Sequence, residues 1–154
     1  TVRAVENARA MLAACEAALP VDIAVCAAAV ADWRVATETE TKIKKSGAPP
    51  QLTLVENPDI LATLSRHPDH RPTLVVGFAA ETDAVAQNAA AKRVRKGCDW
   101  IVANSVAAGA TFGADDNTVS IIDAAGQEDW PRLSKAQVAE RLAGRIAKSL
   151  GRPS

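Results

Sequence analysis

The chain has 154 residues, enough for one domain with a sizeable hydrophobic core, and its 18 basic and 18 acidic residues give a formal net charge of zero. This balance argues against a nucleic-acid-binding or membrane-surface protein, because both need an excess of positive charge. No apolar run approaches the roughly 18 residues that cross a bilayer, so we expect neither a membrane nor a nucleic-acid partner. Cys15, Cys26 and Cys98 form no CxxC pair, and we expect a reduced, cytoplasmic protein.

The first third of the chain predicts a helix, a buried strand and a long loop. Apolar residues at helical spacing predict a helix over 2–19, which Pro20 ends. The continuous apolar run 21–30 is typical of a buried parallel strand. Residues 35–50 show no apolar periodicity and predict a long loop, and the alternation in 51–56 predicts another strand.

The tripeptide Asn57-Pro58-Asp59 has the composition of a helix start. Asn57 suits the N-cap, Pro58 suits the first helical position, and Asp59 carries the negative charge that a helix N-terminus favours. We expect this helix to end near His67.

The second half continues the alternation of strands and helices. The predicted elements are strands over 73–80, 99–104 and 118–123, the last at a sheet edge, and a helix over 82–96. Gly97 is expected to end that helix. Ser134 and Gln137 have the spacing of a capping box, which predicts a last helix to about Leu150.

This order of elements predicts an α/β fold, a three-layer Rossmann-like sandwich with a mostly parallel sheet, formed by residues 1–154 as a single domain. In open α/β sheets, ligands bind beyond the carboxyl ends of the strands. The four predicted strand ends that we expect to form one rim are 29–32, 56–59, 77–82 and 103–105.

A phosphate site in this chain would have to use lysines and helix N-termini, because the GxGxxG and GxxxxGK[ST] fingerprints are both absent. Lys42, Lys44 and Lys45 lie in the predicted loop, and Lys92 and Lys96 share one face of a predicted helix. The residue pattern alone allows either group to be an ordinary solvated surface.

The other candidate residues also allow two interpretations. Asp32 could bind a ribose hydroxyl or a magnesium ion, or it could be a turn residue at the strand end. Asn57 and Asp59 could bind a ligand or cap their helix. Phe78 could contact a base or belong to the core, and Cys26 is expected to be a packing residue. No Ser–His–Asp or Cys–His arrangement is present, so an enzyme of this sequence would act by positioning and charge neutralisation.

Several short motifs occur in an order that resembles the phosphopantothenoylcysteine synthetase domain of the bacterial bifunctional coenzyme A biosynthesis proteins. The motifs are AAVADWR (28–34), KIKK (42–45), ENPDIL (56–61), VGFAAET (76–82), KRVRKG (92–97), DWIVANSV (99–106) and FGADDNTV (112–119). The resemblance therefore runs along nearly the whole chain.

The resemblance implies a CTP-dependent acid–amino-acid ligase of coenzyme A biosynthesis, an amide synthase that couples 4′-phosphopantothenate to L-cysteine. CTP, with Mg²⁺, would activate the carboxylate as an acyl-cytidylate, and cysteine would then form the amide. It also implies a homodimer and, in the full protein, a fused flavin-dependent decarboxylase domain. That domain is absent from this sequence, so no FMN is expected in this segment.

The resemblance also implies site residues. Those that would contact CTP are Cys26, Ala27, Ala28, Asp32, Lys42, Asn57, Pro58, Asp59, Ile60, Phe78, Lys92 and Lys96. Lys42 would also be catalytic, reaching the triphosphate during activation, and the resemblance assigns no metal ligands. Family domains begin with a glycine-rich segment upstream of the position of Thr1 that helps to hold the acyl substrate. We therefore expect the C-terminal major part of a ligase domain, N-terminally truncated, that binds CTP and has weak or no full activity.

Two alternatives remain open at the level of sequence. One is a non-catalytic module for dimerisation or nucleotide binding. The other is a Rossmann-like NAD(P)-dependent oxidoreductase, which the absent GxGxxG disfavours.

Overall fold

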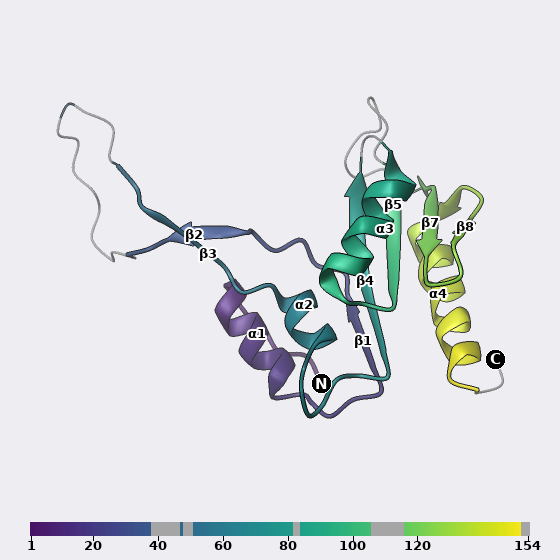
Figure 1. Ribbon diagram of the computed structural model, residues 1–154, viewed down its shortest axis with the longest axis horizontal. Coiled ribbons are helices and arrows are strands. Elements are labelled where there is room, and N and C mark those ends of the chain that lie inside the picture. Colours follow the sequence, from purple (N-terminus) through teal and green to yellow (C-terminus); the bar gives the residue numbers. More distant parts are fainter. Residues whose placement is uncertain (38–46, 48–50, 82–83, 106–115, 152–154) are drawn as a thin grey trace.

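The structure, a computed structural model, describes residues 1–37, 47, 51–81, 84–105 and 116–151 (Figure 1). Its helices are α1 (Ala8–Glu16), α2 (Ile60–Ser65), α3 (Val85–Lys96) and α4 (Lys135–Ser149). Its strands are β1 (Ile23–Cys26), β2 (Trp33–Val35), β3 (Leu54–Glu56), β4 (Leu74–Glu81), β5 (Trp100–Ser105), β6 (Asp116–Asn117), β7 (Val119–Ile122), β8 (Gln127–Asp129) and β9 (Leu133–Ser134).

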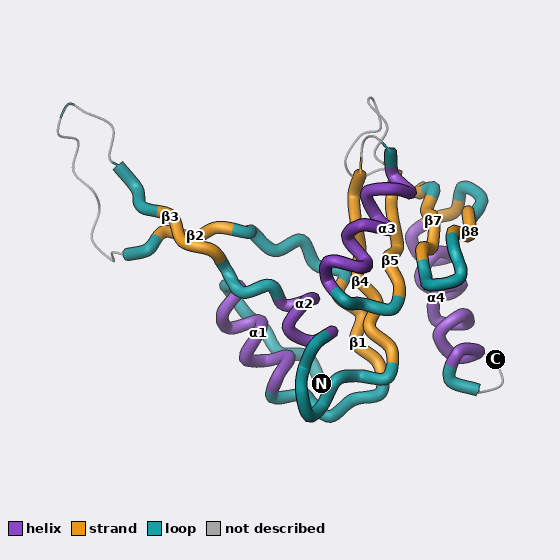
Figure 2. Tube along the Cα trace, in the orientation of Figure 1, coloured by secondary structure: helices purple, strands orange, loops and turns teal. Residues whose placement is uncertain are grey.

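Five strands form the main sheet, in the order β1-β4-β5-β7-β8 (Figure 2). Strands β1, β4 and β5 run parallel, whereas β7 and β8 are antiparallel to their neighbours. Helices α2 and α3 cover one face of the sheet and α4 covers the other. The predicted three-layer Rossmann-like α/β sandwich is confirmed.

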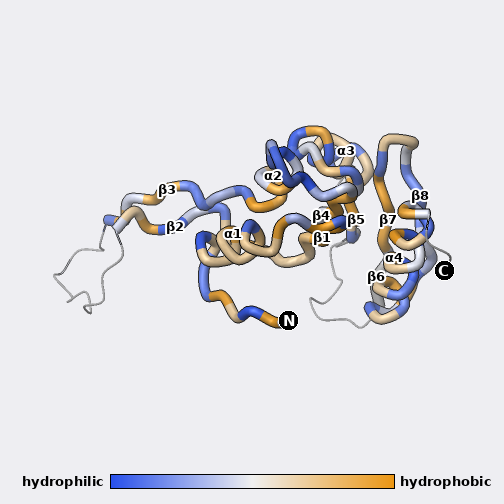
Figure 3. The backbone as a smooth tube through the Cα atoms, turned by 90° about the horizontal axis from the view of Figure 1, so that it is seen from below, coloured by the Kyte–Doolittle hydropathy of each residue, from blue (hydrophilic) through white to orange (hydrophobic). Residues whose placement is uncertain are grey.

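The core consists of two apolar clusters, one on each face of the sheet. On one face, Val138 and Leu142 of α4 pack against β5, β7 and Trp130. On the other, Ala89 of α3 packs against Val75 and the second face of β5. Since both faces are buried, β4 and β5 need nearly continuous apolar sequences. The hydrophobic strand β7 contrasts with the more hydrophilic β8 beside it (Figure 3).

Strands β2 and β3 form an antiparallel hairpin that projects from the body of the protein, here called the arm (Figure 1). Trp33 pairs with Glu56 and Val35 with Leu54. Two expectations are corrected: the strand predicted over 51–56 does not join the main sheet, and Val35, predicted as the first residue of a loop, is the last residue of β2. Three-residue strands carry too little periodicity to show which partner they pair with.

The first helix and the first strand are both shorter than predicted. Helix α1 begins at Ala8 rather than at residue 2, because the Asn7 side chain caps it and accepts a hydrogen bond from Ala10 N at 2.9 Å. Strand β1 pairs only with β4 within the described structure, so it lies at the sheet edge and Val25 is 46% exposed. The predicted parallel strand is present but covers only Ile23–Cys26, and the prediction that it is buried was wrong.

The N-cap of α2 is Asp59 and not Asn57. Asp59 Oδ1 accepts a hydrogen bond from Ala62 N at 3.0 Å, whereas the Asn57 amide donates to the Ala31 carbonyl at 2.8 Å. The sequence offered two competent caps two residues apart, and a long-range contact decided between them.

The strand predicted over 118–123 is not at an edge. It is β7, and β8 pairs with its outer side through a short hairpin that ends at Gly126. Strand β8 is polar and only three residues long, so its sequence did not indicate a strand.

The predicted end of α3 and the predicted start of α4 are confirmed, whereas α3 begins at Val85 and not at residue 82. Gly97, at φ +75°, ends α3. Ser134 and Gln137 form the capping box of α4, with Gln137 N donating to Ser134 Oγ at 3.2 Å and Ser134 N donating to Gln137 Oε1 at 2.9 Å. None of the helices in the described part of the chain is long and apolar enough to cross a membrane.

Candidate functional site

The chain that leaves β1 and the chain that enters α2 are joined at the base of the arm. Asn57 N donates to the Asp32 carbonyl at 2.8 Å, and Asn57 Nδ2 donates to the Ala31 carbonyl at 2.8 Å. Two segments that the sequence indicated separately, 26–32 and 57–60, are thus held side by side.

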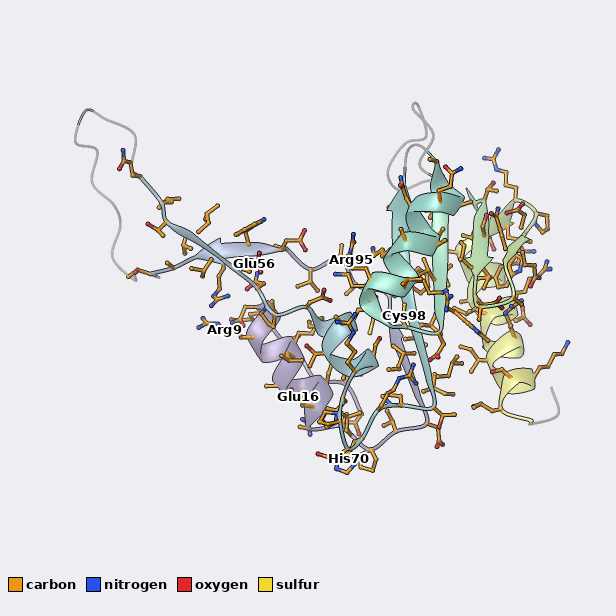
Figure 4. All side chains as sticks on the ribbon, in the orientation of Figure 1. Arg9, Glu16, Glu56, His70, Arg95 and Cys98 are labelled. Carbon is orange, nitrogen blue, oxygen red and sulfur yellow. The ribbon has the colours of Figure 1, made fainter. Side chains whose placement is uncertain are left out.

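Arg34 lies across the same junction. Its Nη1 donates to the Glu56 carbonyl oxygen and, at 3.4 Å, to Asn57 Oδ1. Sequence reasoning assigned no role to Arg34, although the residue lies in the AAVADWR motif directly after the predicted strand. Figure 4 places Glu56 at the arm base and Arg95 at the end of α3 nearest to it.

Lys92 and Lys96 of α3 both contact other elements of the site. Lys92 Nζ donates to the Phe78 carbonyl at 2.9 Å, and Lys96 forms an ion pair with Asp59, keeping 20% of its side chain exposed. The two ammonium groups are therefore anchored on β4 and on the start of α2. Because an ammonium group has three N–H donors, each can bond to a further oxygen atom of a ligand.

Asp59 is an ionised partner for Lys96. Its burial raises the pKa, but hydrogen bonds from Lys96 and the Ala62 amide, together with the positive charges of Lys96 and Arg95, outweigh this effect. The pKa of Asp59 is therefore below its ordinary value, and the carboxylate is charged at neutral pH.

Cys26, at the carboxyl end of β1, is a neutral thiol. Burial raises its pKa to about 11, and the nearby Cys15, Cys98 and Asp59 groups add to the rise. A thiol is nucleophilic only as the thiolate, so Cys26 is not an activated nucleophile at neutral pH. This agrees with its expected role in packing.

The remaining predicted residues differ in their surroundings. Asp32 is exposed, as are Ala27 and Ala28, between β1 and the arm. Ile60 is buried in the first turn of α2, directly after Pro58 and Asp59.

The Phe78 ring packs against the apolar cluster beneath α4, so its backbone carbonyl, not its ring, meets Lys92. Lys42, Lys44 and Lys45 lie outside the described residues. Within the described part of the chain, no three His, Cys, Asp or Glu side chains gather in a way that could hold a metal ion.

An open hollow of about 430 Å³ lies between α1 and α2. Its lining residues are Glu16, Asp59, Ala62, Thr63, Arg66, His67 and Pro68. Of the residues predicted to contact CTP, it includes only Asp59. It therefore lies beside the site at the arm base.

The site combines two lysines, a carboxylate at a helix start and exposed backbone beyond an edge strand. Lysines bind phosphate oxygens as mobile point charges, and a carboxylate can accept hydrogen bonds from sugar hydroxyls. Fold and site together define a Rossmann-like α/β domain whose rim suits an anionic, polar ligand.

Comparison with known proteins identifies the family more closely. Residues 1–150 match the DNA/pantothenate metabolism flavoprotein C-terminal domain, and the chain belongs to this family.

The chain is also similar to curated relatives. It is 40% identical over 134 residues to the coenzyme A biosynthesis bifunctional protein CoaBC of Haemophilus influenzae, covering 87% of this chain and 33% of that protein. It is 41% identical over 139 residues to CoaBC of Mycobacterium tuberculosis, covering 84% of this chain and 33% of that protein. The chain thus spans about a third of the length of these relatives.

Solved structures share the fold. The crystal structure of the C-terminal domain of CoaBC superposes with a TM-score of 0.71 at 31% identity, covering 96% of this chain and 64% of that one. The DNA/pantothenate metabolism flavoprotein from Streptococcus pneumoniae gives a TM-score of 0.77 at 16% identity, covering 97% of this chain and 73% of that one, a likeness of fold alone.

Proposed function

We propose that this chain is the CTP-binding part of a phosphopantothenate–cysteine ligase of coenzyme A biosynthesis. The observation that carries the proposal is the anchoring of Lys96 on Asp59 of segment 57–60 and of Lys92 on the Phe78 carbonyl of β4, the strand that pairs with β1. The names of the relatives, all coenzyme A biosynthesis bifunctional proteins, support the pathway. Family membership favours this function over an NAD(P)-dependent oxidoreductase.

The proposed reaction has two steps, and in both the nucleophile belongs to a substrate. The carboxylate of 4′-phosphopantothenate attacks the α-phosphorus of CTP, forming an acyl-cytidylate as pyrophosphate leaves. The amine of L-cysteine then attacks the acyl carbon, forming the amide as CMP leaves. A protein nucleophile is unnecessary, which agrees with the raised pKa of the Cys26 thiol.

The protein would contribute binding and charge neutralisation. Lys92 and Lys96 would hold the triphosphate, with the backbone of 26–28 and residues 57–60 against the rest of the nucleotide. Lys42 is the proposed catalytic lysine for the activation step. The exposed Asp32 suits a ribose hydroxyl or a magnesium ion, and Mg²⁺, usually held by one or two carboxylates plus substrate phosphates, would neutralise charge on the triphosphate.

We further propose that residues 1–154 form one domain and that two copies pair as a homodimer in the cytoplasm, with a fused flavin-dependent decarboxylase domain in the full protein. The arm supports pairing, because Trp33 is 55% exposed and Leu54 is 52% exposed on an element that projects from the body. Exposed large apolar side chains gathered on one projection are typical of an interaction surface.

A nucleotide panel tests the proposal. With Mg²⁺, CTP at about 100 times its Kd should raise the Tm by roughly 5–10 °C, more than ATP, NADPH or FMN does. Lys92→Gln and Lys96→Gln should each weaken CTP binding about tenfold, since each removes a charge-assisted contact. Lys135→Gln, on the exposed first turn of α4, is the charge-matched control.

The alternatives give different results. Equal shifts with all nucleotides, or none with CTP, would contradict the proposal. A larger shift with NADPH would favour the oxidoreductase, and dimerisation without nucleotide binding would favour the non-catalytic module.

A further inference from the structure

The arm and the proposed nucleotide pocket share one set of hydrogen bonds. Asn57 contributes its backbone amide to Asp32 and its side-chain amide to Ala31, and Arg34 of β2 contacts both Glu56 and Asn57. These contacts join the exit of β1, the first strand of the arm and the chain that enters α2.

We infer that Arg34 is a positioning residue of the nucleotide site. It holds Asn57–Asp59 against the exit of β1, and it couples binding of the nucleotide to the position of the arm. The inference rests on the proposed function for the identity of the ligand. The contacts themselves are properties of the protein without ligand.

Arginine suits this position better than lysine. Both of its bonds here, to the Glu56 carbonyl and to Asn57 Oδ1, come from one nitrogen, Nη1, which the rigid planar guanidinium holds in place. A lysine ammonium has enough N–H donors for both acceptors, but its flexible stem would not fix them in one geometry. Arg34→Lys therefore keeps the charge and removes the positioning.

Arg34 acts on the site through Asn57. When Arg34 holds Asn57 Oδ1, the Asn57 amide group is oriented with its Nδ2 toward Ala31, and the segment that ends in Asp59 is fixed. Asp59 in turn contacts Lys96. Loss of Arg34 would loosen this chain of contacts without removing a group that touches the nucleotide.

The link to the arm is reciprocal. Arg34 is the central residue of β2, paired with Val55 of β3, so a change at its guanidinium is transmitted to the arm backbone. If the arm position alters nucleotide affinity, the nucleotide must alter the arm position by the same free energy. Trp33, next to Arg34 and 55% exposed, is a natural reporter, because Trp100 and Trp130 are buried.

The experiment compares Arg34→Gln and Arg34→Lys with wild type and with Lys135→Gln. Without ligand, hydrogen exchange of the Asn57 amide should be about tenfold faster in both Arg34 variants, while urea unfolding shows a global stability close to that of Lys135→Gln. Their affinity for CTP with Mg²⁺ should fall about tenfold in titration calorimetry. The change in Trp33 emission on CTP binding should be present in wild type and lost in both variants.

Wild-type Asn57 exchange together with wild-type CTP affinity in Arg34→Gln would overturn the inference. A loss in Arg34→Gln that Arg34→Lys fully restores would also overturn it, because charge alone would then suffice. If the wild-type protein does not bind CTP, the proposed function fails, and Asn57 exchange still decides the role of Arg34: faster exchange supports it and unchanged exchange contradicts it.

Discussion

At the residue scale, Asp59 has two structural roles that one pair of variants can separate. Its Oδ1 caps α2 and its Oδ2 pairs with Lys96. Asp59→Asn keeps a capping oxygen and should cost about 0.5 kcal/mol, because the lost ion pair is partly exposed. Asp59→Ala loses both and should cost about 1.5 kcal/mol in urea unfolding. Equal losses in the two variants would show that the cap is unimportant.

Cys26 should make stability depend on alkaline pH. Because its folded pKa is raised to about 11 from 9.0, its contribution is complete below pH 9 and is lost as pH rises through 11. The loss should be smaller than the roughly 2.7 kcal/mol that a shift of this size corresponds to, because the thiol is only partly buried and solvent screens its charge. Urea unfolding at about pH 8 and about pH 10.5 should show a steeper fall for wild type than for Cys26→Ala. The same fall in both proteins would exclude Cys26 as its source.

At the scale of elements, two glycines of helices should respond in opposite directions to alanine. Gly97 ends α3 at φ +75°, so Gly97→Ala should destabilise the protein by about 1 kcal/mol. Gly144 lies inside α4 with no neighbouring atom within 4 Å of an added Cβ, so Gly144→Ala should stabilise it by roughly 0.5–1 kcal/mol. Thermal unfolding of both variants tests the pair, and a stabilising Gly97→Ala would contradict the assigned helix end.

At the scale of the whole molecule, the arm should carry the proposed dimer. Leu54→Lys places a charge on an exposed apolar position of β3 and should convert a dimer into a monomer in analytical ultracentrifugation. Val94→Lys is a matched control, since Val94 is 70% exposed on α3. A dimer that survives Leu54→Lys and dissociates with Val94→Lys would move the interface from the arm to α3.

The strong local signals were sufficient for much of the fold. The continuous apolar runs of β4 and β5, the capping box at Ser134 and the stop at Gly97 are encoded within a few residues, so they could be predicted from the sequence. The same holds for the list of candidate residues, which the motif order supplied. Local patterns and motif order did not show what each of those residues contacts.

The α/β class, the order of the main helices and strands and the family resemblance could all be predicted from the amino-acid sequence, because they depend on local periodicity and short motifs. Three features depend on the folded arrangement: Asp59 and not Asn57 caps α2, Lys92 and Lys96 contact Phe78 and Asp59, and β2 pairs with β3. The lysine contacts and the strand pairing join residues far apart in the chain, and the choice of cap depends on the long-range bond from Asn57 to Ala31; no local pattern contains the energy of such contacts.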